Sequence, residues 1–364
     1  MAVEKIKIES LLLLSKNYPV FDVRSPSEFA RAHIPGAYSL PIFDDDARKI
    51  IGTAYKHSGR QQAIKIGLDY FSSSMKALLE KAEEIINKNF HGKSSVFVHC
   101  WRGGMRSAAI SWLLDLYGYK VYTLAGGYKA FRNWVFQQSN KPYEFKILGG
   151  YTGSGKTLLI QELKRLGHPT IDLEELAIHK GSAFGECEDP QPRQEMFENL
   201  IAINLFKQEI KLQQQKEQGL FNNDFFSSGI WLEDESQRIG GLNIPKGIWD
   251  KMRNSQLYFI DVPFEERLSY IMATYGTIKK QNIIDAILRI EKRLGGLEAR
   301  NAIQLIQQDN FRQAFSILLK YYDKYYDKAL NNRKNLSVLL NKIPCNTVSL
   351  NNIHKLSFLQ TSIQ

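Results

Sequence analysis

The segment GYTGSGKT, residues 150–157, restricts the possible folds of this chain more than any other feature. It fits the pattern G-x-x-x-x-G-K-[ST] in full; the apolar run FKIL precedes it, and TLLIQELKRLG follows with helical spacing. Glycines let backbone N–H groups turn inward around an anion, and the N-terminus of the following helix contributes a positive dipole end. The segment therefore predicts a diphosphate or triphosphate site in an α/β domain.

Two residues of this phosphate loop have separate expected roles: Lys156 reaches terminal phosphate oxygens, and Thr157 can bind Mg²⁺. The expected phosphate contacts are Gly150, Thr152, Gly153, Ser154, Gly155, Lys156 and Thr157. An acidic metal ligand is expected where a nearby strand ends, and the candidates are Asp172, Glu233, Asp234 and Asp261. Because such a loop reads phosphate and not base, ATP, GTP and a diphosphate on another carrier all fit.

A second loop, HCWRGGMRS at residues 99–107, places a cysteine directly after the apolar run VFV. Gly103 and Gly104 allow a tight ring of N–H groups before a helix, which lowers the pKa of a thiol. Arg102 and Arg106 add positive charge and can bind an oxyanion. Cys100 is therefore expected to act as a nucleophile. Since H-C-x5-R-S is also typical of protein tyrosine phosphatases, an inert thiol, a phosphatase and a sulfur or selenium carrier stay open here.

Strand and helix patterns alternate along the chain, which predicts an α/β fold with parallel sheets. Strands are expected near 18–23, 95–99 and 119–124, and helices at 69–90 and 107–117. SNKPY, at 139–143, interrupts the alternation. We therefore expect a first α/β domain at 1–138, a P-loop α/β domain at 139–270 and a helical, basic region at 271–364.

The bulk composition favours a polyanionic partner. The 364 residues carry a formal charge of +10, and the isoelectric point is near 9.2. The chain shows neither a membrane-spanning run nor a signal-peptide pattern, and its three cysteines are far apart. A reducing, cytoplasmic setting without membrane association is expected.

The segments around the cysteine loop distinguish among its alternatives. FDVRSPSEFARAHIPGAYSLPIF (21–43) and LAGGYKAFRNW (124–134) resemble the rhodanese family, so residues 1–138 are expected to form a rhodanese-like domain. This resemblance implies that Cys100 occupies the persulfide-carrying position. The loop is one residue longer than is usual for a sulfurtransferase, which resembles relatives that accommodate larger oxyanions such as phosphate.

The complete set of motifs resembles one family, the bacterial tRNA 2-selenouridine synthases. The segments that carry the resemblance are HCWRGGMRS, LAGGYKAFR, GGYTGSGKT, HKGSAFG, QPRQEMFEN and EDESQRIG. The resemblance implies conversion of wobble 2-thiouridine in tRNA to 2-selenouridine, through an S-geranylated intermediate. It implies geranyl diphosphate on the phosphate loop, selenium on Cys100, and the oxyanion of selenophosphate on Arg102, Gly103, Gly104 and Arg106. The implied partners are tRNA and the selenophosphate-producing enzyme.

Further site residues follow from the remaining segments. His179, Ser182, Glu235 and Arg238 are expected to contact substrate, and Thr157 with Asp234 to hold a metal ion. Two other functions fit parts of the sequence. One is a P-loop kinase or ATPase with a rhodanese-like phosphatase or sulfurtransferase module, and the other is a non-catalytic tRNA-binding protein.

Overall fold

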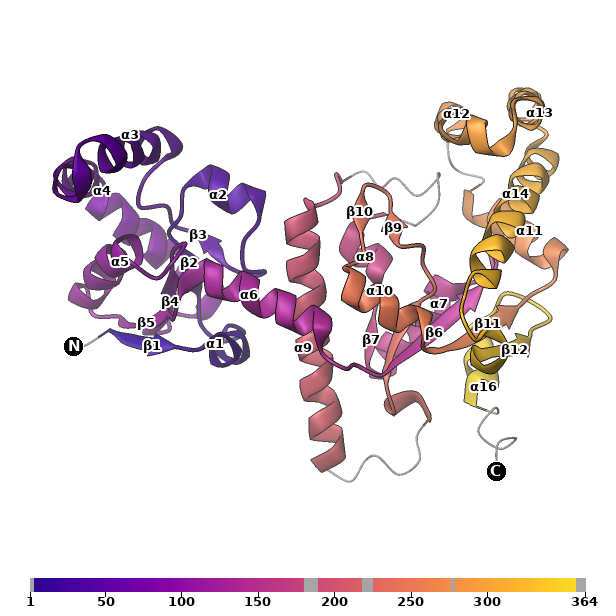
Figure 1. The fold of residues 1–364 in the computed structure, drawn as a ribbon, viewed down its shortest axis with the longest axis horizontal. Helices are drawn as coiled ribbons and strands as arrows, with labels where there is room; N and C mark the ends of the chain where they lie inside the picture. Colours follow the sequence, from indigo (N-terminus) through magenta and orange to yellow (C-terminus); the bar gives the residue numbers. More distant parts are fainter. Residues whose placement is uncertain (1–2, 180–188, 218–224, 276–278, 358–364) are drawn as a thin grey trace. The chain divides into compact units, whose positions relative to one another are not determined.

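The computed structural model describes residues 3–179, 189–217, 225–275 and 279–357 (Figure 1). The chain divides into two compact units. The N-terminal unit comprises Met1–Gln138 with Glu198–Leu200, and the C-terminal unit comprises Ser139–Phe197 with Ile201–Gln364. Each unit contains a five-stranded parallel sheet, so the expected α/β fold class is confirmed.

The sheet of the N-terminal unit has the order β1-β5-β4-β2-β3. Its strands are β1 (Glu4–Ile6), β2 (Val20–Asp22), β3 (Tyr38–Ser39), β4 (Ser95–His99) and β5 (Lys120–Leu124). The helices are α1 (Ile8–Leu14), α2 (Pro26–Arg31), α3 (Asp45–His57), α4 (Gly59–Phe90), α5 (Met105–Leu116) and α6 (Gly127–Asn140). Because β4 lies between two strands, most of its side chains are buried, and Cys100 follows directly after it.

Local signals account for several helix ends in this unit. Ser25 and Glu28 form a capping box at the start of α2, and Asp44 accepts a hydrogen bond from Ala47 N at the start of α3. His91 adopts a left-handed conformation at the end of α4. The expected helix at 69–90 is longer than the sequence indicated, since α4 begins at Gly59 and α3 precedes it.

The sheet of the C-terminal unit has the order β12-β11-β6-β8-β7. Its strands are β6 (Phe145–Gly150), β7 (Thr170–Ile171), β8 (Ile230–Glu233), β11 (Gln256–Asp261) and β12 (Leu340–Pro344), and β9 (Arg238–Ile239) pairs with β10 (Leu242–Asn243). The helices are α7 (Lys156–Arg165), α8 (Leu173–Ala177), α9 (Gln194–Glu217), η1 (Phe225–Ser227), α10 (Lys246–Arg253), α11 (Phe264–Tyr275), α12 (Lys280–Leu294), α13 (Gly296–Gln307), α14 (Phe311–Asn331), α15 (Leu336–Leu339) and α16 (Asn352–Ser357).

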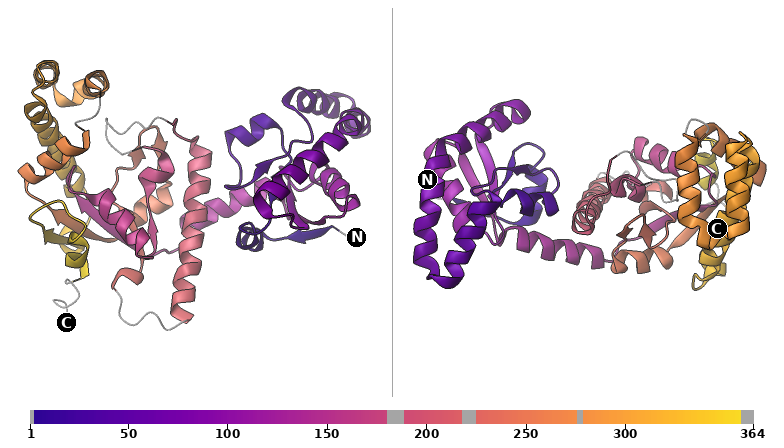
Figure 2. Two further views of the ribbon diagram at one scale, coloured as in Figure 1. Left: turned by 180° about the vertical axis from the view of Figure 1, so that it is seen from behind. Right: turned by 90° about the horizontal axis from the view of Figure 1, so that it is seen from above.

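The expected helical region at the C-terminal end of the chain is present. Helices α11 to α14 pack side by side around an apolar cluster that includes Ile287 and Phe315 (Figure 2). The chain then returns to the sheet, where β12 pairs with β11. No helix among the described residues is long and apolar enough to cross a bilayer.

Candidate functional site

The Cys100 thiol lies at the carboxyl end of β4, among hydrogen-bond donors. Its sulfur is 3.3 Å from the Ser107 hydroxyl and accepts a hydrogen bond from Gly104 N, also at 3.3 Å. Burial raises the pKa of the thiol, but Ser107 and backbone N–H groups of the loop stabilise the thiolate, and the net pKa is lowered. The loop therefore favours the nucleophilic form of the cysteine.

A close backbone approach fixes the shape of this loop. Gly127, at the start of α6, has φ +60°, and a Cβ there would lie 2.4 Å from Cys100 O and 2.6 Å from Gly103 N. The N–H groups of Tyr128 and Lys129 donate to Cys100 O and Trp101 O at 2.8 and 2.9 Å. The glycine pair of LAGGYKAF thus lets the N-terminus of α6 hold the loop carbonyls, which leaves loop N–H groups directed at the sulfur.

A buried ion pair lies behind the loop. Arg24 donates to both carboxylate oxygens of Asp22 and to Ala32 O, and its guanidinium lies 3.7 Å from the ring centroid of Tyr128. His99 is fully buried, and this burial lowers its pKa, so the imidazole is neutral near pH 7. The D-x-R part of the rhodanese-like segment therefore supports the loop through Tyr128.

The two loop arginines have different surroundings. Arg102 is exposed, whereas Arg106 donates to Glu28 at 2.8 Å and is about one quarter exposed. Glu28 also accepts from Arg48 and from Ser25 N. The predicted residues Arg102, Gly103, Gly104 and Arg106 therefore surround Cys100 within one loop. Glu28 contacts this loop through Arg106, and the sequence did not indicate it.

Replacing Ser107 with alanine is expected to raise the pKa of Cys100. A hydrogen bond to a charged group contributes about 1.5–3 kcal/mol, which corresponds to about one pKa unit or more. Since a raised pKa lowers the thiolate fraction below that pKa, alkylation by iodoacetamide should slow about tenfold at pH values below the wild-type pKa and match the wild type well above the new pKa. The pH profile of Cys100 alkylation, followed by peptide mass spectrometry, measures this.

Ser111→Ala is the matched control for Ser107→Ala. Ser111 is equally buried one turn further along α5, but its hydroxyl has no hydrogen-bond partner in the part of the chain that the structure describes. Its profile should coincide with that of the wild type. An unmoved inflection in Ser107→Ala would show that the hydroxyl does not stabilise the thiolate.

The phosphate loop follows β6 at the centre of the second sheet. Gly150, Gly153 and Gly155 have φ values of +151°, +80° and +82°. A Cβ at Gly150 would lie 2.5 Å from the Ser154 hydroxyl, and one at Gly153 would lie 2.8 Å from Ile271. Lys156 begins α7 and reaches back over the loop, where its Nζ donates to Gly150 O at 2.9 Å. The three glycines with positive φ and the start of α7 give this loop the backbone form of an anion cradle.

Residues of α11 and α14 hold this loop from outside. Tyr151 donates to Asp327 at 2.7 Å, and Arg267 donates to Thr152 O while forming a bidentate pair with Asp323. Tyr326 accepts from Gly150 N and donates to Asp234 at 2.6 Å. The helical region therefore supports the phosphate loop, a role that its sequence did not reveal.

Asp234, the expected metal ligand, is engaged in this support. One of its carboxylate oxygens accepts from Tyr326, and the other accepts from the buried Arg333, both at 2.6 Å. Asp172 caps α8 by accepting from Glu175 N. Neither carboxylate belongs to the acidic cluster described next.

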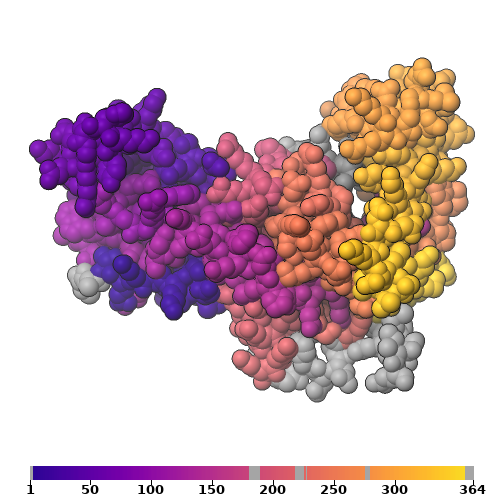
Figure 3. Space-filling view, in the orientation of Figure 1, coloured from indigo at the N-terminus to yellow at the C-terminus, as the bar shows by residue number. Residues whose placement is uncertain are grey.

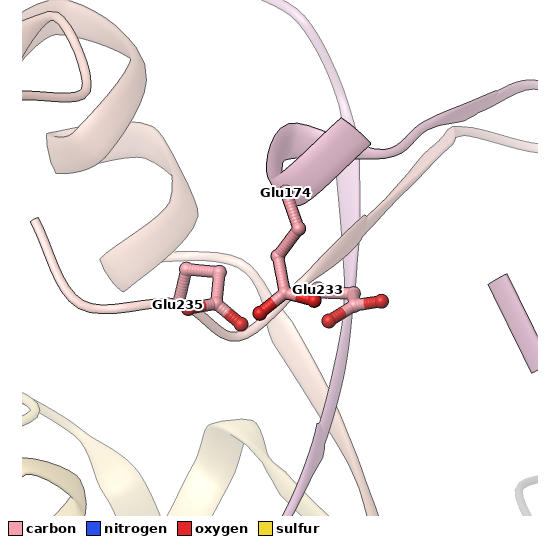
Figure 4. Close-up of side chains that lie close together, drawn as sticks. All are labelled: Glu174, Glu233 and Glu235. Atoms are coloured by element: carbon pink, nitrogen blue, oxygen red, sulfur yellow. The ribbon is translucent and has the colours of Figure 1, made fainter. Parts of the chain in front are cut away.

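Three glutamates beside the phosphate loop have converging carboxylates, as Figure 4 shows. One ligand oxygen each from Glu174, Glu233 and Glu235 lies within 4.8 Å of the others. Glu233 is 1% exposed, and its Oε1 has no hydrogen-bond partner in the described structure. Burial, then repulsion from the neighbouring carboxylates, raises the pKa of Glu233 and Glu235, and Lys156 acts in the opposite direction. Such a hard, oxygen-only donor set fits a divalent cation.

His179 and Arg238, which were also predicted to contact substrate, are close to these glutamates in the sequence but do not belong to the acidic cluster. His179 and Arg238 flank the β9–β10 turn; a Cβ at Gly240 would lie 2.7 Å from the His179 ring, and Arg238 donates to Gly240 O. Gln191 joins this turn to the end of α8. Ser182 lies outside the described residues. Glu174 was not expected, because no local pattern marks a carboxylate in the first turn of a short helix as a site residue.

Comparisons with known proteins match two successive parts of the chain to known families. A family model described as tRNA 2-selenouridine synthase AAA domain matches residues 143–344, and one described as rhodanese-like domain matches residues 8–133. A tRNA 2-selenouridine synthase of Sulfurovum sp. is 33% identical over 348 residues, covering 86% of this chain and 89% of that protein. The one of Bdellovibrio bacteriovorus is 32% identical and covers 93% and 96%. The one of Nitrosomonas europaea is 37% identical and covers 71% and 63%.

Proposed function

The chain belongs to the tRNA 2-selenouridine synthase family, and from this premise we propose that it replaces sulfur by selenium in the wobble 2-thiouridine of tRNA. The observation that supports this most strongly is the presence of two anion-binding loops in one chain. One surrounds a thiol of lowered pKa, and the other has the backbone form of a diphosphate cradle. A reaction with a selenophosphate donor and a prenyl diphosphate donor needs both.

Cys100 is proposed to release selenium from selenophosphate: its thiolate attacks phosphorus, the P–Se bond breaks, and hydroselenide leaves with the bonding electrons. The hydroselenide then attacks C2 of the geranylated base, geranyl thiolate leaves, and water hydrolyses the phosphocysteine to phosphate and the free thiol. The lowered pKa increases the fraction of thiolate at neutral pH. The exposed Arg102 and the N–H groups of Gly103 and Gly104 would hold the phosphate part of the donor. Arg106 would join them through the guanidinium N–H groups that Glu28 does not occupy. The selenophosphate-producing enzyme is the expected partner for this step.

The phosphate loop is proposed to bind the diphosphate of geranyl diphosphate. The thiouridine sulfur would attack C1 of the geranyl group, the C–O bond would break, and diphosphate would leave with the bonding electrons. Lys156 and the loop N–H groups would stabilise the negative charge that develops on this leaving group. S-alkylation would prepare the later exchange, because a thiolate leaves C2 more readily than sulfide does.

A divalent cation such as Mg²⁺ is proposed at Glu174, Glu233 and Glu235, with Thr157 as the ligand from the phosphate loop. The unpartnered Glu233 oxygen and the convergence of three carboxylates support this set over Asp234, which Tyr326 and Arg333 already bind. When bound, the cation would neutralise charge on a diphosphate. Glu174 and Glu235 would supply the other two carboxylate ligands.

Glu233→Gln is expected to raise the melting temperature without added cation and to remove most of the cation response. The first effect follows from reduced repulsion among buried carboxylates, and the second from loss of a ligand. At a cation concentration about a hundredfold above Kd, the wild type should gain about 2.7 kcal/mol of stability. Thermal unfolding with and without Mg²⁺ or Mn²⁺ measures both effects.

Asp234→Asn serves as the contrasting variant. It should lower stability, since it weakens the contacts with Tyr326 and Arg333, and yet keep the cation response. A full response in Glu233→Gln, or its loss only in Asp234→Asn, would place the cation elsewhere.

The proposed function is tested by mass analysis of nucleosides. Substrate tRNA containing 2-thiouridine is incubated with the purified enzyme, selenophosphate and geranyl diphosphate, and then digested. S-geranyl-2-thiouridine should appear without selenophosphate, and 2-selenouridine should appear when it is added. A folded enzyme that yields neither product, or that hydrolyses ATP without responding to tRNA or the prenyl donor, would refute the proposal.

A further inference from the structure

Beyond its acidic first turn, which contains Asp45 and Asp46, the helical hairpin formed by α3 and the first turns of α4 is basic. Residues 47–68 contain five basic residues and no acidic ones, and the basic residues are Arg48, Lys49, Lys56, Arg60 and Lys65. All five are exposed, and Arg48 is paired with Glu28. Residues 1–138 contain 19 of the 48 Lys and Arg and 12 of the 38 Asp and Glu, so they carry seven of the ten net positive charges.

The same hairpin exposes large apolar side chains. Ile50, Tyr55 and Leu68 are 47%, 55% and 57% exposed, and Figure 3 shows α3 and α4 (indigo to violet) at the surface of the N-terminal unit. Cations interleaved with exposed aromatic and aliphatic groups fit RNA, because cations hold phosphates while rings and apolar groups contact bases and riboses.

The hairpin is fixed beside the cysteine loop. The two helices pack against each other, and a Cβ at Gly67 of α4 would be in ordinary contact with Ile51 of α3 at 3.8 Å. Arg60 Nη2 lies 3.9 Å from the sulfur of Met105, the first residue of α5. Met105 and Trp101 are 50% and 38% exposed. The basic surface therefore continues to the edge of the loop that holds Cys100.

We propose that the α3–α4 hairpin binds the phosphate backbone of the tRNA substrate next to the Cys100 loop. Lys49 and Lys56 are two helical turns apart, about 10 Å, so they would engage phosphates of neighbouring nucleotides. Arg60 would continue this track to the loop, where the wobble base is to meet the cysteine. This inference rests on the proposed function and assigns the substrate a surface that the cysteine loop alone does not provide.

The test compares two triple variants of equal charge. Lys49→Gln/Lys56→Gln/Lys65→Gln removes the hairpin cations, and Lys76→Gln/Lys81→Gln/Lys88→Gln removes three exposed lysines further along α4. Binding of 2-thiouridine tRNA is followed by fluorescence anisotropy from about 0.05 to 0.3 M salt. The hairpin variant should bind at least tenfold more weakly near 0.1 M salt, and its salt slope should fall by about 2, at about 0.7–0.9 per lost phosphate contact. The control variant should change less than about threefold.

Three outcomes would overturn the assignment. In the first, the two triple variants weaken tRNA binding equally. In the second, the hairpin variant binds tRNA as the wild type does. In the third, the hairpin variant still binds tRNA but no longer binds the selenophosphate-producing enzyme. Far-UV circular dichroism and melting temperature establish that both variants fold. The proposed function fails separately, since it is decided by the nucleosides that the wild type forms. Selenation by the wild type together with unchanged tRNA binding by the hairpin variant would refute this surface alone.

Discussion

Cys100→Ala is expected to abolish 2-selenouridine formation, by at least about a thousandfold, while S-geranyl-2-thiouridine still forms and accumulates. The physical reason is that the variant lacks the nucleophile of the loop. Ser107 Oγ and Gly104 N both lie 3.3 Å from the sulfur, and in the alanine variant they have no thiolate to stabilise. Geranylation should persist because the phosphate loop belongs to the other compact unit. Nucleoside analysis of tRNA after a fixed incubation measures both products at once.

Cys345→Ala provides the control for loss of a buried thiol. Cys345 packs in the core of the C-terminal unit, where burial raises its pKa, so it has the opposite electrostatic setting. This variant should keep selenation even if its melting temperature falls. Supplying tRNA that already carries the geranyl group isolates the selenium step further. Undiminished selenation of that tRNA by Cys100→Ala would remove the cysteine from the reaction.

Sequence patterns predicted the loops well because each follows a buried parallel strand. Such strands appear as continuous apolar runs, and VFV and FKIL correspond to buried parts of β4 and β6. Glycines then mark where the backbone must turn sharply. The α3–α4 hairpin was harder to predict, since its exposed Ile50, Tyr55 and Leu68 blur the amphipathic pattern that identifies a helix.

The acidic cluster shows what sequence could not supply. Side chains alternate along an extended chain, so Glu233 and Glu235 share one side at the end of β8 while Asp234 faces the other, toward Tyr326 and Arg333. The sequence indicated Asp234 as a metal ligand, but it did not show which side chains at the end of β8 lie with the acidic cluster and which face Tyr326 and Arg333. Glu174 joins the cluster from α8, about sixty residues earlier, and only the packing of α8 near β8 brings it there.

Lys156→Ala is expected to slow geranylation by about a hundredfold to a thousandfold. The ammonium group of Lys156 would stabilise the negative charge that develops as diphosphate leaves. Removal of one such preorganised donor raises the free energy of the transition state by about 2.7–4 kcal/mol. Selenation of tRNA that is already geranylated should remain near the wild-type rate, because Cys100 and its donors are untouched. Single-turnover assays of the two steps, begun from 2-thiouridine tRNA and from geranylated tRNA, separate them.

Lys164→Ala is the matched variant on the same helix. Lys164 lies in the last turn of α7, about half-exposed and paired with Glu175. Its replacement removes the same charge as Lys156→Ala, but at the other end of the helix from the phosphate loop. Its geranylation should stay within about twofold of the wild type, since an exposed pair contributes little. If Lys156→Ala and Cys100→Ala each reduced both steps equally, the two loops could not act on separate donors. Opposite losses in the two variants would instead show that one chain divides prenyl transfer and selenium transfer between its two parallel sheets.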